Sequence, residues 1–230
     1  MKNLAVKSIV QISYIFKACF KLSYFPTGWK IAKVIPTPKP GKPFSNLANN
    51  RPINLLNILG KLMERIICQH FITHLDKNNI TAPHQFGFRC NHTTIHQLQR
   101  VTEHIIIERN KNRTTQLLLL DIQKAFDSVQ HTALITKLHD INTPASILNT
   151  IANYLSDRKF FVPLNDTRSS TKTITAGAVP QGFILGPLFF TIYINDLSTS
   201  QNTRTAIYAD DAGIYALESE PSYNIPTKSY

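Results

Sequence analysis

The sequence predicts an α+β fold in which helices pack on one face of an antiparallel sheet. Long segments have the apolar spacing or density of helices, at residues 3–23, 58–76, 93–111, 131–155 and 184–197. Short apolar runs typical of strands lie among them, at residues 29–35, 116–121, 159–164, 171–176, 204–209 and 212–217.

The composition indicates a folded, basic protein. Of the 230 residues, 43% are hydrophobic, which is enough to build a core in one large or two small domains. Lysine and arginine number 25 against 14 acidic residues, so the net charge is +11 and a polyanionic partner is expected. No apolar run reaches the ~20 residues that cross a bilayer, so no membrane partner is expected. The odd number of cysteines, 3, favours a reducing, intracellular setting over a disulfide framework.

The first half of the chain combines helices with a basic loop. The helix over residues 3–23 is closed by Pro26 and Gly28, and the strand over residues 29–35 follows. Prolines and Gly41 then bracket Lys39 and Lys42, which predicts a loop with exposed cations suited to phosphates.

The second half contains most of the predicted strands. The run at residues 116–121 (QLLLLD) is typical of a central strand buried on both faces. Residues 159–164 and 171–176 are expected to form a hairpin, and residues 204–209 and 212–217 a second one. Residues 218–230 contain almost no core-forming side chains and are expected to be a disordered tail.

Three of the few acidic residues end the most apolar strands: Asp121, Asp210 and Asp211. Buried carboxylates are costly unless a cation or several hydrogen bonds compensate for them. If the two strand ends meet, the carboxylates could hold hard divalent ions such as Mg²⁺. For any one of them alone, a turn or strand-end role is the simpler interpretation.

Three motifs occur in a fixed order: residues 121–127 (DIQKAFD), 180–182 (PQG) and 208–211 (YADD). Together with residues 51–56 (RPINLL), they closely resemble the reverse transcriptase domain of non-LTR retrotransposons of the LINE, jockey-like type. The resemblance covers about residues 10 to 217.

The resemblance implies the fingers and palm of a right-hand polymerase. Residues 1–115 would form the N-terminal helix and fingers, residues 116–217 the palm with the catalytic motifs, and residues 218–230 the tail. A thumb is expected to be missing, so the chain is expected to be a truncated fragment of a mobile-element protein.

The implied activity is RNA-directed DNA synthesis on an RNA template with a DNA primer and deoxynucleoside triphosphates. Asp121 and Asp210 match the ligands of two Mg²⁺ ions, with Mn²⁺ as an alternative, and Asp211 is the adjacent catalytic acid. Nucleus and cytoplasm are the expected locations, from the life cycle of such elements. No protein partner can be inferred.

Further positions match residues that bind the incoming nucleotide. Arg51 would contact the triphosphate, and Gln181 and Gly182 would line the pocket. Phe126 matches a steric gate that rejects a ribose 2′-hydroxyl, although by residue type alone it would be a core aromatic. Lys39 and Lys42 are candidate phosphate contacts beside Arg51, although a solvated surface charge is an equally simple interpretation. The remaining basic residues can supply further contacts to template and primer phosphates, and the sequence does not decide which of them do so; among them are Lys30, Lys33, Arg65, Arg89, Arg100 and Arg158.

One position departs from the family pattern, because Phe183 stands where a serine usually follows PQG. Either the loop repacks around this ring or nucleotide binding suffers. A catalytically inactive remnant that retains only nucleic-acid binding is therefore the second interpretation. An RNA-dependent RNA polymerase is disfavoured by Phe126 and by the residues between Trp29 and Leu56.

Overall fold

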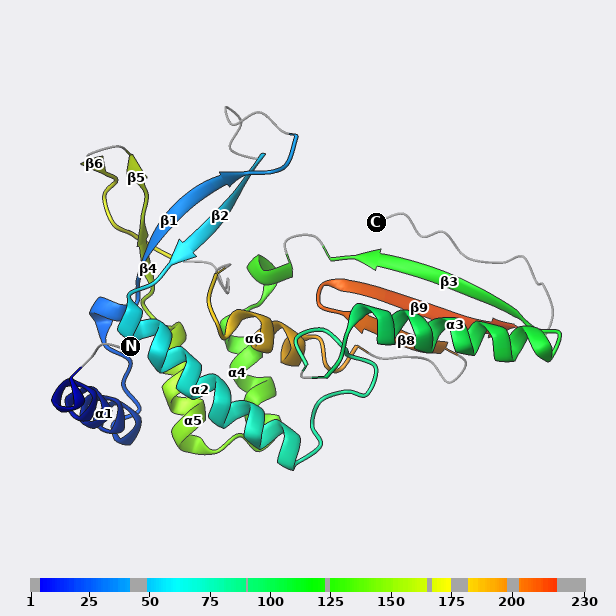
Figure 1. Cartoon of the computed structure of the whole chain (residues 1–230), viewed down its shortest axis with the longest axis horizontal. Helices are drawn as coiled ribbons and strands as arrows, with labels where there is room; N and C mark the ends of the chain where they lie inside the picture. The colour runs from blue at the N-terminus through cyan, green and yellow to red at the C-terminus, as the bar shows by residue number, and fades with distance from the viewer. Residues whose placement is uncertain are drawn as a thin grey trace. The chain divides into compact units, whose positions relative to one another are not determined.

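The structure, a computed structural model, has the expected α+β architecture (Figure 1). It describes residues 5–41, 49–89, 91–122, 125–164, 167–174, 182–197 and 203–218. The chain divides into two compact units, each built from separate parts of the sequence. Unit 1 comprises Met1–Thr81 and Phe126–Tyr193, and unit 2 comprises Ala82–Ala125 and Ile194–Tyr230.

Unit 1 is mainly helical. Its helices are α1 (Val6–Lys21), α2 (Ile58–Lys77), α4 (His131–Asp140), α5 (Ala145–Leu155) and α6 (Gly186–Tyr193). Asn57 is the N-cap of helix α2, and its side chain accepts a hydrogen bond from the Leu59 amide at 2.9 Å. The buried face of this helix carries residues about one turn apart, Met63, Ile67, Phe71 and Leu75.

Unit 1 also contains a mixed sheet with the strand order β2-β1-β4-β7. The strands are β1 (Ile31–Pro38), β2 (Asn50–Leu55), β4 (Lys159–Phe161) and β7 (Lys172–Thr173), with a small hairpin of β5 (Pro163–Leu164) and β6 (Thr167–Arg168) beside them. Strands β1 and β2 are antiparallel and β1 and β4 parallel. Strand β1 continues to Pro38, beyond the predicted end, because β2 pairs with it from Lys33 to Pro38.

Unit 2 contains one long helix and the antiparallel sheet expected for the palm (Figure 1). Helix α3 (Thr94–Asn110) packs against β3 (Thr114–Asp121) and β8 (Thr203–Tyr208). The sheet order is β3-β9-β8, with β9 (Asp211–Glu218) in the centre. The predicted strands at residues 204–209 and 212–217 are thereby confirmed as a hairpin.

The expectation that residues 116–121 form a buried central strand is wrong. Among the described residues β3 pairs with β9 alone, so it is an edge strand. Its four leucines are all exposed, from 37% at Leu120 to 75% at Leu119. The unbroken apolar run therefore belongs to an edge strand whose leucines are exposed on both faces of the sheet within the described structure.

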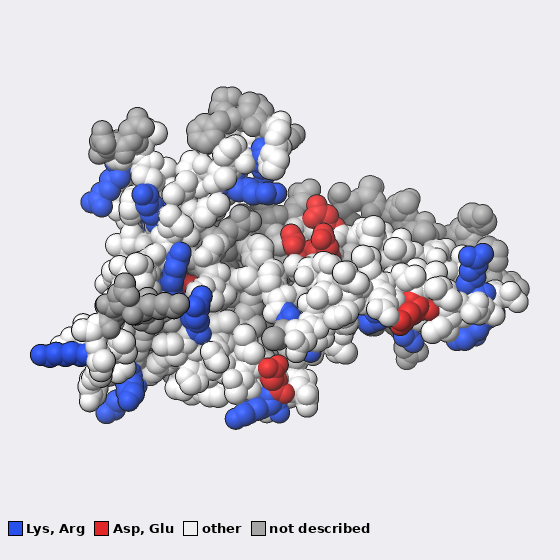
Figure 2. All heavy atoms as spheres, in the orientation of Figure 1, with Lys and Arg blue, Asp and Glu red and all other residues white. Residues whose placement is uncertain are grey.

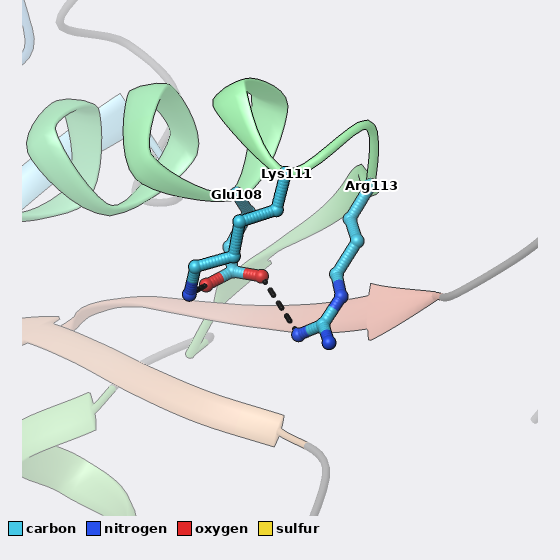
Figure 3. A network of polar contacts seen from close by, with 3 residues as sticks. All are labelled: Glu108, Lys111 and Arg113. Carbon is cyan, nitrogen blue, oxygen red and sulfur yellow. Dashed lines mark hydrogen bonds and ion pairs between the residues drawn. The ribbon is translucent and has the colours of Figure 1, made fainter.

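A compact ionic cluster fixes the turn from α3 into β3 (Figure 3). The buried Glu108 accepts hydrogen bonds from Lys111 Nζ at 2.8 Å and from Arg113 Nη1 at 3.2 Å. The Lys111 hydrogen bond, together with the nearby positive charges, lowers the pKa of Glu108. Its backbone carbonyl also accepts the Arg113 amide at 3.0 Å, so Glu108 sets where β3 begins.

The ends of the predicted domains differ from the observed units. Glu218, expected in the disordered tail, is the last residue of β9, and residues 219–230 lie outside the described residues. The functional division into fingers and palm at residue 115 stays a prediction, because both compact units are discontinuous in sequence. Within the described ranges, no helix combines the length and apolar character needed to span a membrane.

The core of unit 1 makes a stability prediction on α2. Ile67→Ala should lower the free energy of unfolding by about 2–5 kcal/mol, because Ile67 is fully buried and its removal leaves a cavity. Ile72→Ala, on the same helix at 40% exposure, is the matched control and should cost under about 1 kcal/mol. Urea unfolding followed by circular dichroism measures both, and equal losses would contradict the assigned core.

Candidate active site

The three aspartates of the sequence motifs meet at one end of the sheet in unit 2. Asp121 is the last residue of β3 and lies opposite Asp211, the first residue of β9. Asp210 lies beside it in the turn between β8 and β9, after Ala209, which has a positive φ of 59°. Acidic side chains gather at this end of the sheet in Figure 2.

The arrangement has the donor chemistry of a site for hard cations. Cross-strand partners have Cβ atoms about 4.5–5.5 Å apart, so the carboxylates of Asp121 and Asp211 can face one ion. Both residues are exposed, and Asp210 is half-buried. Within the described parts of the chain, no group of three or more His, Cys, Asp or Glu residues is already close enough to hold a metal. The separate roles of Asp121, Asp210 and Asp211 stay predictions.

The turn that carries Asp210 is held by the segment at residues 84–87. The Phe86 amide donates to the Ile207 carbonyl at 2.9 Å, and the Ile207 amide donates to the His84 carbonyl at 3.0 Å. This segment therefore covers the outer edge of β8. Gly87 approaches the turn so closely that a Cβ there would lie 2.1 Å from the Ala209 nitrogen.

Helix α3 supports the same strand through polar contacts. Gln97 Nε2 donates to the Ile207 carbonyl at 3.2 Å and to the His84 carbonyl at 3.0 Å. Arg100 Nη2 donates to the Thr205 carbonyl at 2.6 Å. Its guanidinium is therefore held by the fold, and a contact of Arg100 with nucleic-acid phosphates stays a prediction.

A hollow of about 350 Å³ opens beside the acids within unit 2. Its walls are mostly apolar and include Leu98 and Val101 of α3, Leu117 and Leu119 of β3, and Ala206 of β8. Asp121 and Asp211 also line it. The acids thus border an apolar hollow as well as solvent.

The predicted nucleotide residues belong to unit 1, where the structure describes some of them. Arg51 is exposed on β2 opposite Thr37. Lys39 is also exposed, and its amide donates to the Asn49 carbonyl at 2.8 Å. Lys42 and Gln181 lie outside the described residues.

Gly182 contacts the strand that carries Arg51. Its φ is +99°, and a Cβ at this position would lie 2.6 Å from the Asn54 carbonyl oxygen. Only glycine fits this backbone without displacing β2. The structure therefore brings Gly182 and β2 together, as a shared pocket requires.

Phe126 lies in the 3-10 helix η3 (Ala125–Ser128) and is half-buried. Its ring contacts that of Phe190 on α6, with centroids 5.4 Å apart. Part of the Phe126 ring is therefore held by the core of unit 1 while part stays accessible. This position suits either a core aromatic or a gate, and the role as a gate stays a prediction.

Phe183 is buried inside unit 1 rather than exposed, and its effect on nucleotide binding stays a prediction. Its ring centroid lies 4.2 Å from the guanidinium carbon of Arg158. Tyr154 contacts the same guanidinium, since its ring centroid lies 4.4 Å from that carbon. Such cation–π contacts contribute on the order of 2 kcal/mol when desolvated.

Two of the basic residues that could have contacted phosphates are buried instead. Arg158 is only 1% exposed and donates to the Tyr154 carbonyl at 3.0 Å. Lys30 is 3% exposed and donates to Ser156 Oγ at 3.3 Å, and burial lowers its pKa. Their charges are used inside unit 1, because the flanking aromatic and polar residues enclose them.

A further polar pair, Glu64 and Tyr154, was missed by the sequence analysis. Glu64 is fully buried and accepts the Tyr154 hydroxyl at 2.5 Å and the Ile184 amide at 3.0 Å. Burial raises the pKa of Glu64. The signal in the sequence was an acid on the apolar face of α2, at helical spacing from Gly60, Ile67 and Phe71.

Comparison with known proteins assigns the class. The family described as reverse transcriptase (RNA-dependent DNA polymerase) matches residues 37–225, which include all three aspartates. The chain therefore belongs to the reverse transcriptase family. The resemblance to non-LTR retrotransposon reverse transcriptases is confirmed by its relatives.

The relatives include three proteins of Drosophila melanogaster. The probable RNA-directed DNA polymerase from transposon X-element is 37% identical over 92% of this chain and 24% of its own length. The probable polymerase from transposon BS is 35% identical over 93% of this chain and 24% of its own length. The polymerase from mobile element jockey is 35% identical over 88% and 23%, respectively. The chain thus spans about a quarter of the length of these relatives.

Solved structures share the fold at low sequence identity. Apo telomerase from Candida tropicalis matches 93% of this chain and 44% of its own length, with a TM-score of 0.59 at 12% identity. Telomerase from Candida albicans, solved with a fragment of telomeric RNA, matches with a TM-score of 0.57, at 12% identity over 90% of this chain and 42% of its own length. These matches support the α+β fold of a reverse transcriptase.

The close approach at Gly87 makes a testable prediction for unit 2. Gly87→Ala should lower the opening free energy of the β8–β9 hairpin by about 1–3 kcal/mol, because the added methyl displaces the Ala209 backbone. Amide hydrogen exchange of β8 and β9 measures this loss. Gly28→Ala is the control, since a Cβ there meets no atom within 4 Å. Unchanged exchange in Gly87→Ala would refute the close contact.

Proposed function

We propose that this chain forms the catalytic part of an RNA-directed DNA polymerase, which extends a DNA primer on an RNA template. The observation that carries the proposal is the pairing of Asp121 with Asp211 at the end of an antiparallel sheet, with Asp210 beside them in the turn. These acids lie within a match to the reverse transcriptase family.

The aspartates are proposed to act through bound Mg²⁺, with Mn²⁺ as a substitute. Asp121 and Asp210 would supply the ligands that two ions share, and Asp211 would adjust the charge beside them. Bound ions of this kind lower the pKa of an attacking hydroxyl and stabilise a leaving phosphate. The carboxylates hold and orient the ions, so no protein nucleophile is needed.

Nucleotide selection is proposed for residues of unit 1. Arg51 would bind the triphosphate, since a guanidinium suits planar, bidentate phosphate contacts. Gln181 and Gly182 would border the base and sugar, and Phe126 would exclude a 2′-hydroxyl. The close contact of Gly182 with β2, the strand of Arg51, supports this grouping.

The template and primer are proposed to bind mainly through phosphate contacts. The net charge of +11 supports this, and binding should weaken steeply as salt rises. Lys39 and Lys42 are proposed to contribute, whereas the buried Lys30 and Arg158 are not.

The decisive test is incorporation of deoxynucleotides by the purified chain on a primed RNA template with Mg²⁺. We expect extension that EDTA abolishes, since the carboxylates need ions to act. Asp121→Asn and Asp210→Asn should reduce extension to background for the same reason.

Asp140→Asn is the matched control, because Asp140 is an exposed acid at the end of α4 and should not affect extension. No extension by folded protein that still binds primed RNA would contradict the catalytic proposal. That outcome would leave the nucleic-acid-binding remnant as the function.

The gate role of Phe126 is tested by Phe126→Val. The smaller side chain should let a ribose enter, so the preference for deoxynucleotides over ribonucleotides should fall by about tenfold or more. The ratio of the two kcat/KM values measures this preference. Phe161→Val, a half-buried phenylalanine of β4, should leave the ratio unchanged. An unaltered ratio in Phe126→Val would show that its ring serves only the contact with Phe190.

A further inference from the structure

The segment that follows the PQG motif is held by several parts of unit 1. Gly182 lies against the Asn54 backbone of β2, and Phe183 is stacked on Arg158. The Ile184 amide donates to Glu64 of α2, and Leu185 is fully buried and starts the hydrogen bonding of α6. Successive residues therefore contact different elements, and the segment has little freedom to shift.

The contact of Glu64 differs from the others because it is a polar bond to the backbone. Glu64 uses one carboxylate oxygen for the Ile184 amide and the other for the Tyr154 hydroxyl. A fully buried carboxylate is tolerated only when such donors and nearby positive charge compensate for lost water. Arg158 supplies that charge, and its guanidinium also stacks on Phe183. Glu64 and Phe183 are thus coupled through Arg158.

We propose that Glu64 is a positioning residue for the incoming nucleotide, acting through the Ile184 backbone on Gly182 and on its contact with β2. The proposal rests on the proposed polymerase function, since it assumes that Gly182 borders the nucleotide. Phe183 takes part in the same arrangement, because its ring stacks on Arg158, whose positive charge favours the buried carboxylate.

The two hydrogen bonds of the Glu64 carboxylate allow a rescue experiment with two variants. In Glu64→Gln the amide oxygen can still accept the Ile184 amide, and the NH₂ group can donate to the Tyr154 hydroxyl, because a hydroxyl is both a donor and an acceptor. In Glu64→Met, which has a similar volume, neither hydrogen bond can form. Glu64→Gln therefore removes the charge alone, and Glu64→Met removes the acceptor as well.

The KM for deoxynucleotide should rise about tenfold in Glu64→Met, while kcat and primer binding change little. Glu64→Gln should stay within about threefold of the unsubstituted chain, because it keeps the acceptor for the Ile184 amide. A residue that only stabilised the fold would behave differently, because its loss would lower the free energy of unfolding without a selective rise in KM. The overturning results are therefore a KM in Glu64→Gln as high as that of Glu64→Met, or an unchanged KM in folded Glu64→Met.

A second measurement does not depend on turnover. Hydrogen exchange at the Ile184 amide should speed up in Glu64→Met and stay slow in Glu64→Gln and in Tyr154→Phe. Unaltered protection in Glu64→Met would overturn the positioning role. Failure of the unsubstituted chain to incorporate nucleotides would count against the polymerase function alone, since the exchange pattern still decides whether Glu64 fixes this segment.

Discussion

The register between β3 and β9 is the constraint on which the candidate metal site depends. It runs without a break from Thr114 opposite Glu218 to Asp121 opposite Asp211. A slip of one residue would turn every side chain of β3 to the other face of the sheet, and Asp121 would lose its partner. The cluster around Glu108 sets this register at one end, and the turn packed against Gly87 sets it at the other. The carboxylates meet because both ends of the sheet are fixed.

Unit 1 holds charged side chains inside a small core. Glu64 and Arg158 are both buried, together with Tyr154 and Phe183. Neither charged side chain would be stable there alone, because an isolated buried charge is costly. Together the four residues link α2 and α5 to the chain that enters α6. An apolar cluster could supply similar stability, but it would not fix a backbone amide in one position.

The sequence predicted most helices and the β8–β9 hairpin, because their patterns depend on neighbours close in the chain. The sequence-based predictions were wrong where contacts between distant parts of the chain determine burial or strand pairing. The helix at residues 93–111 was correct in extent, yet the structure exposes Leu98 and buries Gln97, because the Gln97 side chain donates to the carbonyls of His84 and Ile207. Strand β2 was missed because only its pairing with β1 makes it a strand.

The candidate site could likewise be predicted only in part from the sequence. The motifs identified the three aspartates, but their relation across the strands comes from pairing between residues about 90 apart, which no local pattern encodes. The burial of Arg158 could not be predicted either, because two aromatic rings from different elements enclose it. Residue type alone favoured a surface role for this arginine.

The discontinuous units have a consequence for synthesis of the chain on the ribosome. Helix α2 is synthesised 120 residues before the Ile184 amide that its Glu64 binds. The Phe25 amide likewise waits for Asn153, 128 residues further along. Helix α2 therefore lacks its native contact with α5 while all of α3 and β3 are added. Unit 1 can complete its native contacts only after these segments of unit 2 have been synthesised, and contacts between residues so far apart in sequence form slowly.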